Sequence, residues 1–216
     1  MMRKKVLVTG FEPFGNDTIN PALEAVKQLE GIVIDDVEIV TQVVPTVFHE
    51  SIKAAIKAIK THEPDVVICV GQAGGRTQIT PERIAINVDD ARIPDNQKNQ
   101  PIDEPISEDG PAAYWSTLPI KRIVHQMRKD GVPASVSNTA GTYVCNHLFY
   151  GLMHYLTNHA PQIRGGFIHI PYIPEQTIEN GSPSLSLDII VSGLKTAAVI
   201  AATEKDDIRE IGGTTH

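Results

Sequence analysis

Short apolar runs alternate along the chain with segments whose apolar positions recur every three or four residues. The runs Lys5–Phe11 and Val66–Gly71 are nearly continuous in apolar side chains, which is typical of strands buried on both faces. Between them lies His49–Thr61, whose apolar residues fall on one helical face, at Ile52, Ala55, Ile56 and Ile59. This pattern predicts a helix packed on a sheet.

The same alternation continues to the end of the chain. Further strands are expected at Val37–Val44, Arg83–Val88, Ala134–Ser137 and Phe167–Ile170. Further helices are expected at Pro21–Leu29, Ile120–Lys129, Cys145–Asn158 and Leu185–Thr203. Because alternating strands and helices favour parallel pairing, we predict an α/β fold in the form of a three-layer sandwich. A ligand site is then expected at the carboxyl ends of the strands.

Length and composition frame this prediction. The chain has 216 residues, 41% of them apolar and 21% charged, so we expect a single domain over 1–216 with a sizeable core. A net charge of −7 without a basic stripe argues against a nucleic-acid partner.

Targeting signals are weak. The basic start is followed only by the apolar run Val6–Val8, too short for a signal peptide, and the run Ala197–Ala202 is too short to cross a membrane. Two cysteines make no disulfide framework, so we expect a reducing cytoplasm.

Cys145 is the candidate nucleophile. A small-residue turn precedes it and a helical pattern follows it, so the thiol is expected in the first turn of a helix. The free N–H groups and partial positive charge there stabilise a thiolate, and such sites can lower a cysteine pKa to between roughly 3.5 and 7.5. Cys69 lies mid-run in the strand Val66–Gly71 and is expected to be inert core.

An imidazole and a carboxylate complete a candidate catalytic set. His169 closes a short apolar strand, and thiolate plus imidazole are what nucleophilic acyl transfer requires. Alone, it would more often be a core histidine. Glu82, at the mouth of a strand, could accept a hydrogen bond from that imidazole, but Asp89, Asp90 and Asp188 compete for this role on sequence alone.

Three loops carry further candidates. Thr9–Asn16 holds Phe11 and Phe14 beside a glycine turn, which suggests either an apolar pocket or two core aromatics. Gly71–Arg76 could hold a phosphate, yet it matches no phosphate-binding motif. The long segment from Asp89 to Gly110 is typical of a lid, a binding loop or a subunit contact. Its Arg92 could donate to an oxyanion or pair with a neighbouring aspartate.

Six blocks, in order along nearly the whole chain, resemble the signatures of the pyroglutamyl peptidases, also called pyrrolidone-carboxylate peptidases. They are Gly10–Gly15, Gly71–Arg76, Pro81–Arg83, Ala91–Asp95, Ala140–Asn146 and His169–Gln176. The resemblance implies an α/β fold with a mixed, mostly parallel twisted sheet and helices on both faces. It also implies a homotetramer without cofactor or metal, located in the cytoplasm.

The activity implied is that of a thiol exopeptidase. Such an enzyme removes N-terminal pyroglutamate (5-oxoproline) from peptides and proteins through a thioester acyl-enzyme. The family triad maps onto Cys145, His169 and Glu82. The Cys145 N–H and the Arg92 side chain would stabilise the oxyanion.

The resemblance also implies a pocket for the pyroglutamyl ring. Its members are Phe11, Phe14, Asn20, Thr46, Gln72, Ile93, Tyr143 and Val144, with lactam hydrogen bonds from the Asn20 side chain and the Gln72 backbone. Position 143 departs from the pattern, because close bacterial relatives carry phenylalanine there. The tyrosine hydroxyl needs a partner or water.

Two other classes stay open. A nucleoside or phosphate-ester enzyme would use the Gly71–Arg76 loop for phosphate and would leave Cys145 without a role. A binding protein without catalysis would keep the aromatic loop and need no reactive thiol.

Overall fold

The computed structural model describes residues 3–15 and 17–213 and is built on one mixed sheet of six strands in the order β2-β3-β1-β4-β8-β5. The four central strands run parallel, and the two edge strands are antiparallel to their neighbours. In chain order these strands are β1 (Lys4–Phe11), β2 (Val33–Ile34), β3 (Val37–Val44), β4 (Val66–Gln72), β5 (Thr80–Pro81) and β8 (Arg164–Ile170). The expected mostly parallel sheet is confirmed.

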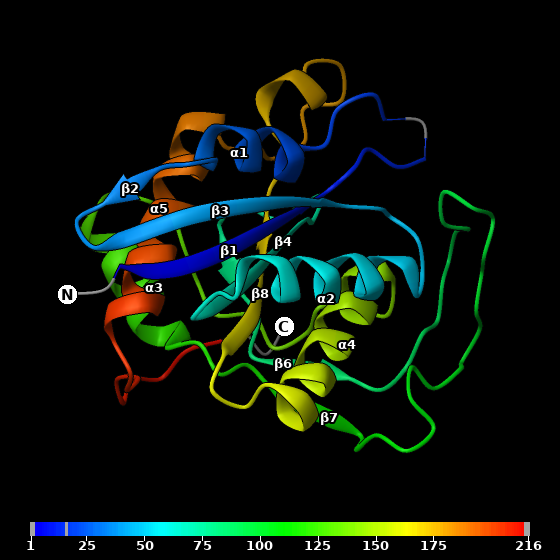
Figure 1. Ribbon diagram of the computed structural model, residues 1–216. Helices are drawn as coiled ribbons and strands as arrows, with labels where there is room; N and C mark the ends of the chain where they lie inside the picture. The colour runs from blue at the N-terminus through cyan, green and yellow to red at the C-terminus, as the bar shows by residue number, and fades with distance from the viewer. Residues whose placement is uncertain (1–2, 16, 214–216) are drawn as a thin grey trace.

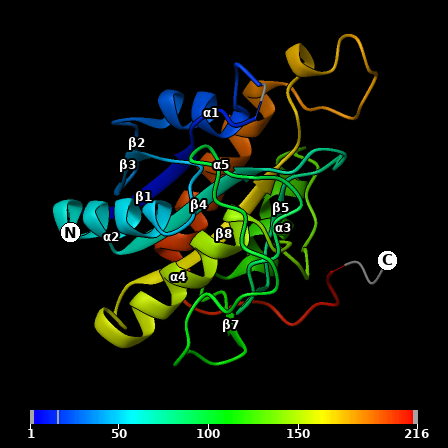
Figure 2. The same cartoon turned by 90° about the vertical axis from the view of Figure 1, so that its right-hand side faces the viewer.

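Helices cover both faces of this sheet (Figures 1 and 2). One layer contains α1 (Pro21–Leu29), α3 (Ile120–Lys129) and α5 (Leu187–Thr203), and the other contains α2 (Glu50–His62) and α4 (Val144–His159). The three-layer arrangement predicted from the alternating pattern is therefore confirmed, and most element bounds agree with the prediction to within a few residues.

Alternation along the strands divides the core between the two helix layers. In β1, Val6 and Val8 pack with α1, α3 and α5, whereas Leu7 between them packs with α2 and α4. Cys69 and Phe167 point to the same side as Leu7. Because successive side chains of a strand point to opposite faces, the nearly continuous apolar runs fill both cores at once.

Two expected strands differ from the structure. The segment expected at Arg83–Val88 contains the shorter β6 (Ile84–Ile86), which leaves the main sheet and pairs antiparallel with β7 (Ala113–Trp115). The expected strand Ala134–Ser137 is not formed, and only isolated bridges join it to Ile79 and Glu82.

Pro81 explains the missing strand. Backbone bonds run from Ser135 N to Ile79 O (3.1 Å) and from Ser137 N to Pro81 O (3.0 Å), as in a parallel ladder. Proline has no N–H, so the bond from residue 81 that would join these two contacts cannot form. The ladder is therefore broken just before Glu82.

The remaining segments are a short 3-10 helix, η1 (Pro174–Gln176), and the long loop between β6 and β7, which lies beyond the ends of α2 and α4 (Figure 1). In the part of the chain that the structure describes, no helix is both long and apolar enough to pass through a lipid bilayer. Within the same residues, no cluster of three or more histidine, cysteine, aspartate or glutamate side chains is arranged to hold a metal ion.

Cys69 provides a test of the core. It is fully buried and lies beside the buried Thr9 in the register of β1 and β4, and the Thr9 side chain hydrogen-bonds to the thiol. Cys69→Ser should lower the free energy of unfolding by about 1 kcal/mol, near the low end of the usual cost for a buried hydroxyl, because the new hydroxyl can pair with Thr9. Urea unfolding measures this difference.

The double variant Thr9→Val/Cys69→Ser, compared with Thr9→Val, serves as the control. It removes the partner, so the serine should cost more in that background. Equal costs in both backgrounds would show that the two side chains do not interact.

Candidate active site

The first turn of α4 presents Cys145 and unpaired backbone donors. Cys145 is the second residue of this helix, and the N-cap residue Tyr143 supplies no side-chain cap. The first intrahelical bond runs from His147 N to Tyr143 O (3.0 Å). The N–H groups of Val144, Cys145 and Asn146 therefore have no acceptor within the helix, and the positive end of its dipole lies at the thiol.

Asn146 fixes this end of α4. Its side chain is fully buried and accepts a hydrogen bond from Ile86 N (3.0 Å) while donating to Ile86 O (2.9 Å) and Val88 O (3.1 Å). An amide that makes all these contacts to β6 and the residues after it leaves the helix start little freedom. Sequence reasoning assigned no role to Asn146, since only the fold brings Ile86 beside it.

His169 and Glu82 form a buried pair. The His169 Nδ1 lies 2.7 Å from Glu82 Oε1, and the two residues are 4% and 0% exposed. Strand register produces this contact, because Thr80 of β5 pairs with His169 and the backbone N of Glu82 donates to Phe167 O (2.8 Å). A carboxylate only accepts, so Nδ1 carries the proton and Nε2 is left as an acceptor.

Arg76 completes the pair in a way that the sequence did not reveal. Its Nη1 lies 2.7 Å from the same Glu82 Oε1, and its Nη2 donates to Thr139 O (3.1 Å). The arginine of the glycine-rich loop is thus bound to protein partners and is not a free phosphate ligand. Only its position in a loop after a strand, next to a strand-end acid, gave any hint of this contact.

The thiol and the imidazole lie on the same face of the sheet. A Cβ placed on Gly71 would lie 2.9 Å from Cys145 Sγ, so the sulfur packs directly over that glycine. Gly71 is paired in register with His169 across β4 and β8. Paired residues of parallel strands face the same way and lie about 4.8 Å apart, so the imidazole stands beside the sulfur. Any side chain at position 71 would clash with the Phe167 ring and with the sulfur.

The electrostatics of the buried pair favour an ionised carboxylate and a neutral imidazole. Burial raises the pKa of Glu82, but the hydrogen bond and charge of His169 and the charge of Arg76 outweigh it and hold that pKa below its usual value. Burial lowers the pKa of His169, and the opposing effect of Glu82 is smaller. His169 is therefore an unprotonated base near neutral pH.

The pKa of the Cys145 thiol differs from the expectation based on the sequence. Burial raises the pKa of Cys145 to about 12, with the charge of Glu82 adding to this effect and that of Arg76 opposing it. The expectation that the helix terminus alone makes Cys145 a thiolate near neutral pH is wrong for this structure. Near neutral pH the site therefore holds a protonated thiol and a neutral imidazole.

A small cavity of about 50 Å³ adjoins the thiol. It is lined by every expected pocket residue except Ile93, namely Phe11, Phe14, Asn20, Thr46, Gln72, Tyr143 and Val144, together with Cys145. Ile93 is 48% exposed and does not line the cavity, and Arg92 in the same loop is exposed. Within residues 3–15 and 17–213, Arg92 makes no hydrogen bond or ion pair, so the expected contact with a neighbouring aspartate is absent there.

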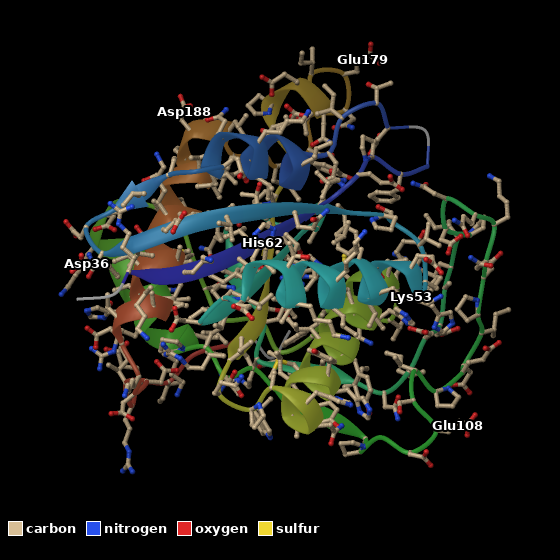
Figure 3. All side chains as sticks on the ribbon, viewed as in Figure 1. Asp36, Lys53, His62, Glu108, Glu179 and Asp188 are labelled. Carbon is tan, nitrogen blue, oxygen red and sulfur yellow. The ribbon has the colours of Figure 1, made fainter. Side chains whose placement is uncertain are left out.

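The three other acids considered as partners of His169 lie elsewhere. Asp89 is buried against His147, with Oδ2 at 2.6 Å from Nδ1, while Nε2 of the same ring accepts from His49 N (2.8 Å). Asp90 is exposed, and Asp188 points outward at the start of α5 (Figure 3). Of the four acids considered, the structure brings only Glu82 to His169. The Asp89–His147 pair joins the long loop to α4 and to the segment before α2, and sequence reasoning missed it.

Comparison with known proteins gives concordant matches. The family model described as pyroglutamyl peptidase matches residues 4–204. Pyrrolidone-carboxylate peptidase of Bacillus licheniformis is 64% identical over 99% of both chains, and that of Bacillus velezensis is 62% identical over 100% of both chains.

Solved structures agree with these matches. The pyroglutamyl peptidase I structure from Bacillus amyloliquefaciens is similar with a TM-score of 0.96 at 62% identity, covering 97% of this chain and 100% of that one. A mutant pyrrolidone carboxyl peptidase from Pyrococcus furiosus has a TM-score of 0.88 at 44% identity, covering 91% of this chain and 97% of that one.

The raised thiol pKa predicts how Cys145 reacts with a neutral alkylating agent. Since the thiolate is the nucleophile, the rate of iodoacetamide labelling should rise about tenfold per pH unit between pH 7 and pH 9. Cys69, also with its pKa raised to about 12 by burial, should remain unlabelled because the core excludes the reagent. Mass spectrometry of quenched samples gives both rates. A labelling rate that is already constant above pH 6 would instead show a thiolate–imidazolium pair at rest.

Proposed function

The chain belongs to the pyroglutamyl peptidase family, and from this premise we propose that it removes N-terminal pyroglutamate from peptides through a thioester on Cys145. One observation carries the mechanism. A buried, carboxylate-bound imidazole stands beside a thiol at an uncapped helix terminus, next to a small cavity.

Acylation begins with the neutral pair. Cys145 Sγ attacks the carbonyl carbon that joins pyroglutamate to the next residue, and its proton moves to Nε2 of His169. Glu82, held ionised by Arg76, stabilises the imidazolium that forms and keeps Nδ1 protonated. Because the resting thiol is protonated, sulfur attack and proton transfer are coupled.

The imidazolium then returns its proton. His169 protonates the leaving amine, the C–N bond breaks and a pyroglutamyl thioester remains on Cys145. A water molecule, deprotonated by the same imidazole, attacks the thioester and releases pyroglutamic acid with the free thiol. Each proton taken by His169 is given back within the same half-reaction.

The helix terminus supplies the oxyanion donors in this proposal. The N–H of Cys145, with those of Val144 and Asn146 beside it, has no helical acceptor and points out of the positive end of α4. Arg92 is proposed as a second donor. Its guanidinium is exposed and uncommitted in the described part of the chain, so it can approach a bound substrate.

The cavity suits an end group without charge. Pyroglutamate is a lactam and carries no α-ammonium group, and no carboxylate lines the cavity. Phe11, Phe14, Tyr143 and Val144 would pack on the ring, with Asn20, Thr46 and Gln72 as the polar groups. The Asn20 side chain already caps α1 through Ala22 N (2.9 Å) and donates to Glu12 O (3.1 Å), which fixes its orientation.

The contacts of Arg76 and Glu82 bear on the two alternative functions, a phosphate-ester enzyme and a binding protein without catalysis. A phosphate-ester enzyme would need Arg76 free, and this side chain is bound to Glu82 and Thr139. A binding protein would not need the buried Glu82–His169 pair.

The domain organisation, the cellular location and the oligomeric state are also proposals. We place the chain as a single catalytic domain that acts in the cytoplasm as a homotetramer without cofactor. Exposed apolar side chains such as Ile102, Trp115 and Ile178 provide surface for subunit contacts.

Substitution of the nucleophile or the base tests the proposed activity. Cys145→Ala and His169→Ala should each abolish release of the amine from a chromogenic pyroglutamyl amide, because one removes the attacking atom and the other its proton acceptor. The unsubstituted protein should leave the matching prolyl and glutaminyl amides intact. Circular dichroism establishes that the variants are folded. If a folded Cys145→Ala protein still turns over the pyroglutamyl amide, the thioester proposal is wrong.

Glu82→Gln tests the role of the carboxylate through the pH profile. His169 must be neutral to accept the thiol proton, and its pKa is lowered, so the acidic limb of kcat/KM should lie below pH 6.5. Glu82 raises the pKa of His169. Its neutralisation should therefore move the limb to lower pH, while kcat falls on the order of a hundredfold because the imidazolium loses its counter-charge.

Asp188→Asn is the matched control. It also removes one negative charge, but from the exposed start of α5, and should leave both the limb and kcat in place. A limb that moves to higher pH in Glu82→Gln would contradict the assigned role.

A further inference from the structure

The cavity beside Cys145 is too small for the ring that the proposed function assigns to it. Its volume is about 50 Å³. A protein cavity that holds benzene, a ring of six heavy atoms, has a volume of roughly 150 Å³. The pyroglutamyl lactam with its carbonyl oxygen also has about six heavy atoms, so by the same comparison at least one wall must move before the ring fits.

Most of the walls are fixed. Phe11 is 2% exposed in β1 and packs against Phe167, and Val144 is 0% exposed in the first turn of α4. Asn20 caps α1, and the Thr46 hydroxyl donates to Glu12 O (2.9 Å). Moving any of these would disturb the sheet, a helix terminus or a buried hydrogen bond.

Gln72 ends β4, and its side chain accepts a hydrogen bond from Gln176 Nε2 (2.9 Å). Tyr143 and Phe14 form the outer wall of aromatic rings. Both are only partly buried, and their ring centres lie 6.3 Å apart. The Tyr143 ring also meets Phe48 edge-on, with ring centres 5.5 Å apart. Tyr143 differs from Phe14 in one respect, because its hydroxyl donates a hydrogen bond to Pro94 O (3.1 Å).

The acceptor of this bond is firmly held. Asp95, the next residue, is 3% exposed and accepts hydrogen bonds from the backbone N–H groups of Phe48 (2.9 Å), Gln97 (2.8 Å) and Asn99 (2.9 Å). The Pro94 carbonyl is therefore held in place, and the Tyr143 side chain is the part that can move. When the ring moves outward, its hydroxyl must leave Pro94.

We propose that the Tyr143 hydroxyl is a latch that keeps the pyroglutamyl pocket closed in the free protein and opens when substrate enters. The inference rests on the proposed function, since it concerns the same pocket. The hydrogen bond to Pro94 stabilises the closed form only, so part of the substrate's binding free energy is spent in breaking it. Tyr143 thereby sets the affinity for the pyroglutamyl group without taking part in the chemistry.

This mechanism predicts a gain on removal of one oxygen atom. Tyr143→Phe keeps the ring against Phe14 and Phe48 and deletes only the latch. One neutral hydrogen bond corresponds to about a two- to tenfold change in an equilibrium constant, so the dissociation constant should fall by about that factor. In turnover, KM should fall and kcat/KM should rise by the same factor. Damage to the fold would not produce such a gain.

Binding is measured by titration calorimetry with a pyroglutamyl dipeptide amide in the Cys145→Ala background, with and without Tyr143→Phe. Tyr150→Phe is the matched control. Its hydroxyl also donates to a proline carbonyl, Pro111 O at 2.7 Å, but Tyr150 lies further along α4 and does not line the cavity. That variant should lose stability and leave the dissociation constant unchanged.

The outcomes separate the two proposals. If the Cys145→Ala protein does not bind the pyroglutamyl amide at all, the proposed function fails. If it binds and Tyr143→Phe binds equally well, the hydroxyl does not hold the pocket closed and the latch is refuted. If Tyr143→Phe binds more weakly, the hydroxyl shapes the pocket for substrate and does not close it, which also refutes the latch.

Discussion

One carboxylate oxygen organises the proposed catalytic site. Glu82 Oε1 accepts from both His169 and Arg76 at 2.7 Å, in a carboxylate that is 0% exposed. Its second oxygen is also buried, and the nearby Ser137 side chain further lowers the pKa of Glu82. A buried charge of this kind persists only because two partners share it. The tautomer of His169 follows from that contact.

For the Cys145 thiol, in contrast to the Glu82 carboxylate, burial outweighs the interactions that favour the charged form. Helix α4 directs unpaired N–H groups at Cys145, but burial and the negative charge of Glu82 dominate and keep the sulfur protonated. A neutral pair in a site largely shielded from water costs less than an ion pair would. In the proposed mechanism, charge separation is therefore deferred until a substrate carbonyl lies against the sulfur and the proposed oxyanion donors are in use.

Local pattern was sufficient for the framework and for Cys145, His169 and Glu82 as candidates, whereas pocket residues such as Asn20 and Thr46 came from the family resemblance. Apolar runs placed β1 and β4, one-faced periodicity placed α2, and the small-residue turn placed Cys145 in the first turn of α4. Local pattern was not sufficient to predict contacts that depend on strand register. From the residues alone Glu82 could not be preferred over Asp89; the family resemblance singled it out, and the pairing of β5 with β8 shows how it reaches His169. Arg76 became its partner only in the folded loop. The thiol pKa was misjudged for the same reason, because burial is a property of the assembled layers.

The site also costs stability, and the cost lies where the geometry demands it. Pro81 breaks a ladder that would otherwise extend the sheet, and the break comes just before Glu82, which the contact with Phe167 O turns toward His169. Gly71 has no room for a side chain because the Phe167 ring and Cys145 Sγ occupy that space. These two departures from a regular sheet adjoin members of the proposed triad. Strained or underpacked positions in an otherwise consistent fold are therefore informative about where its chemistry lies.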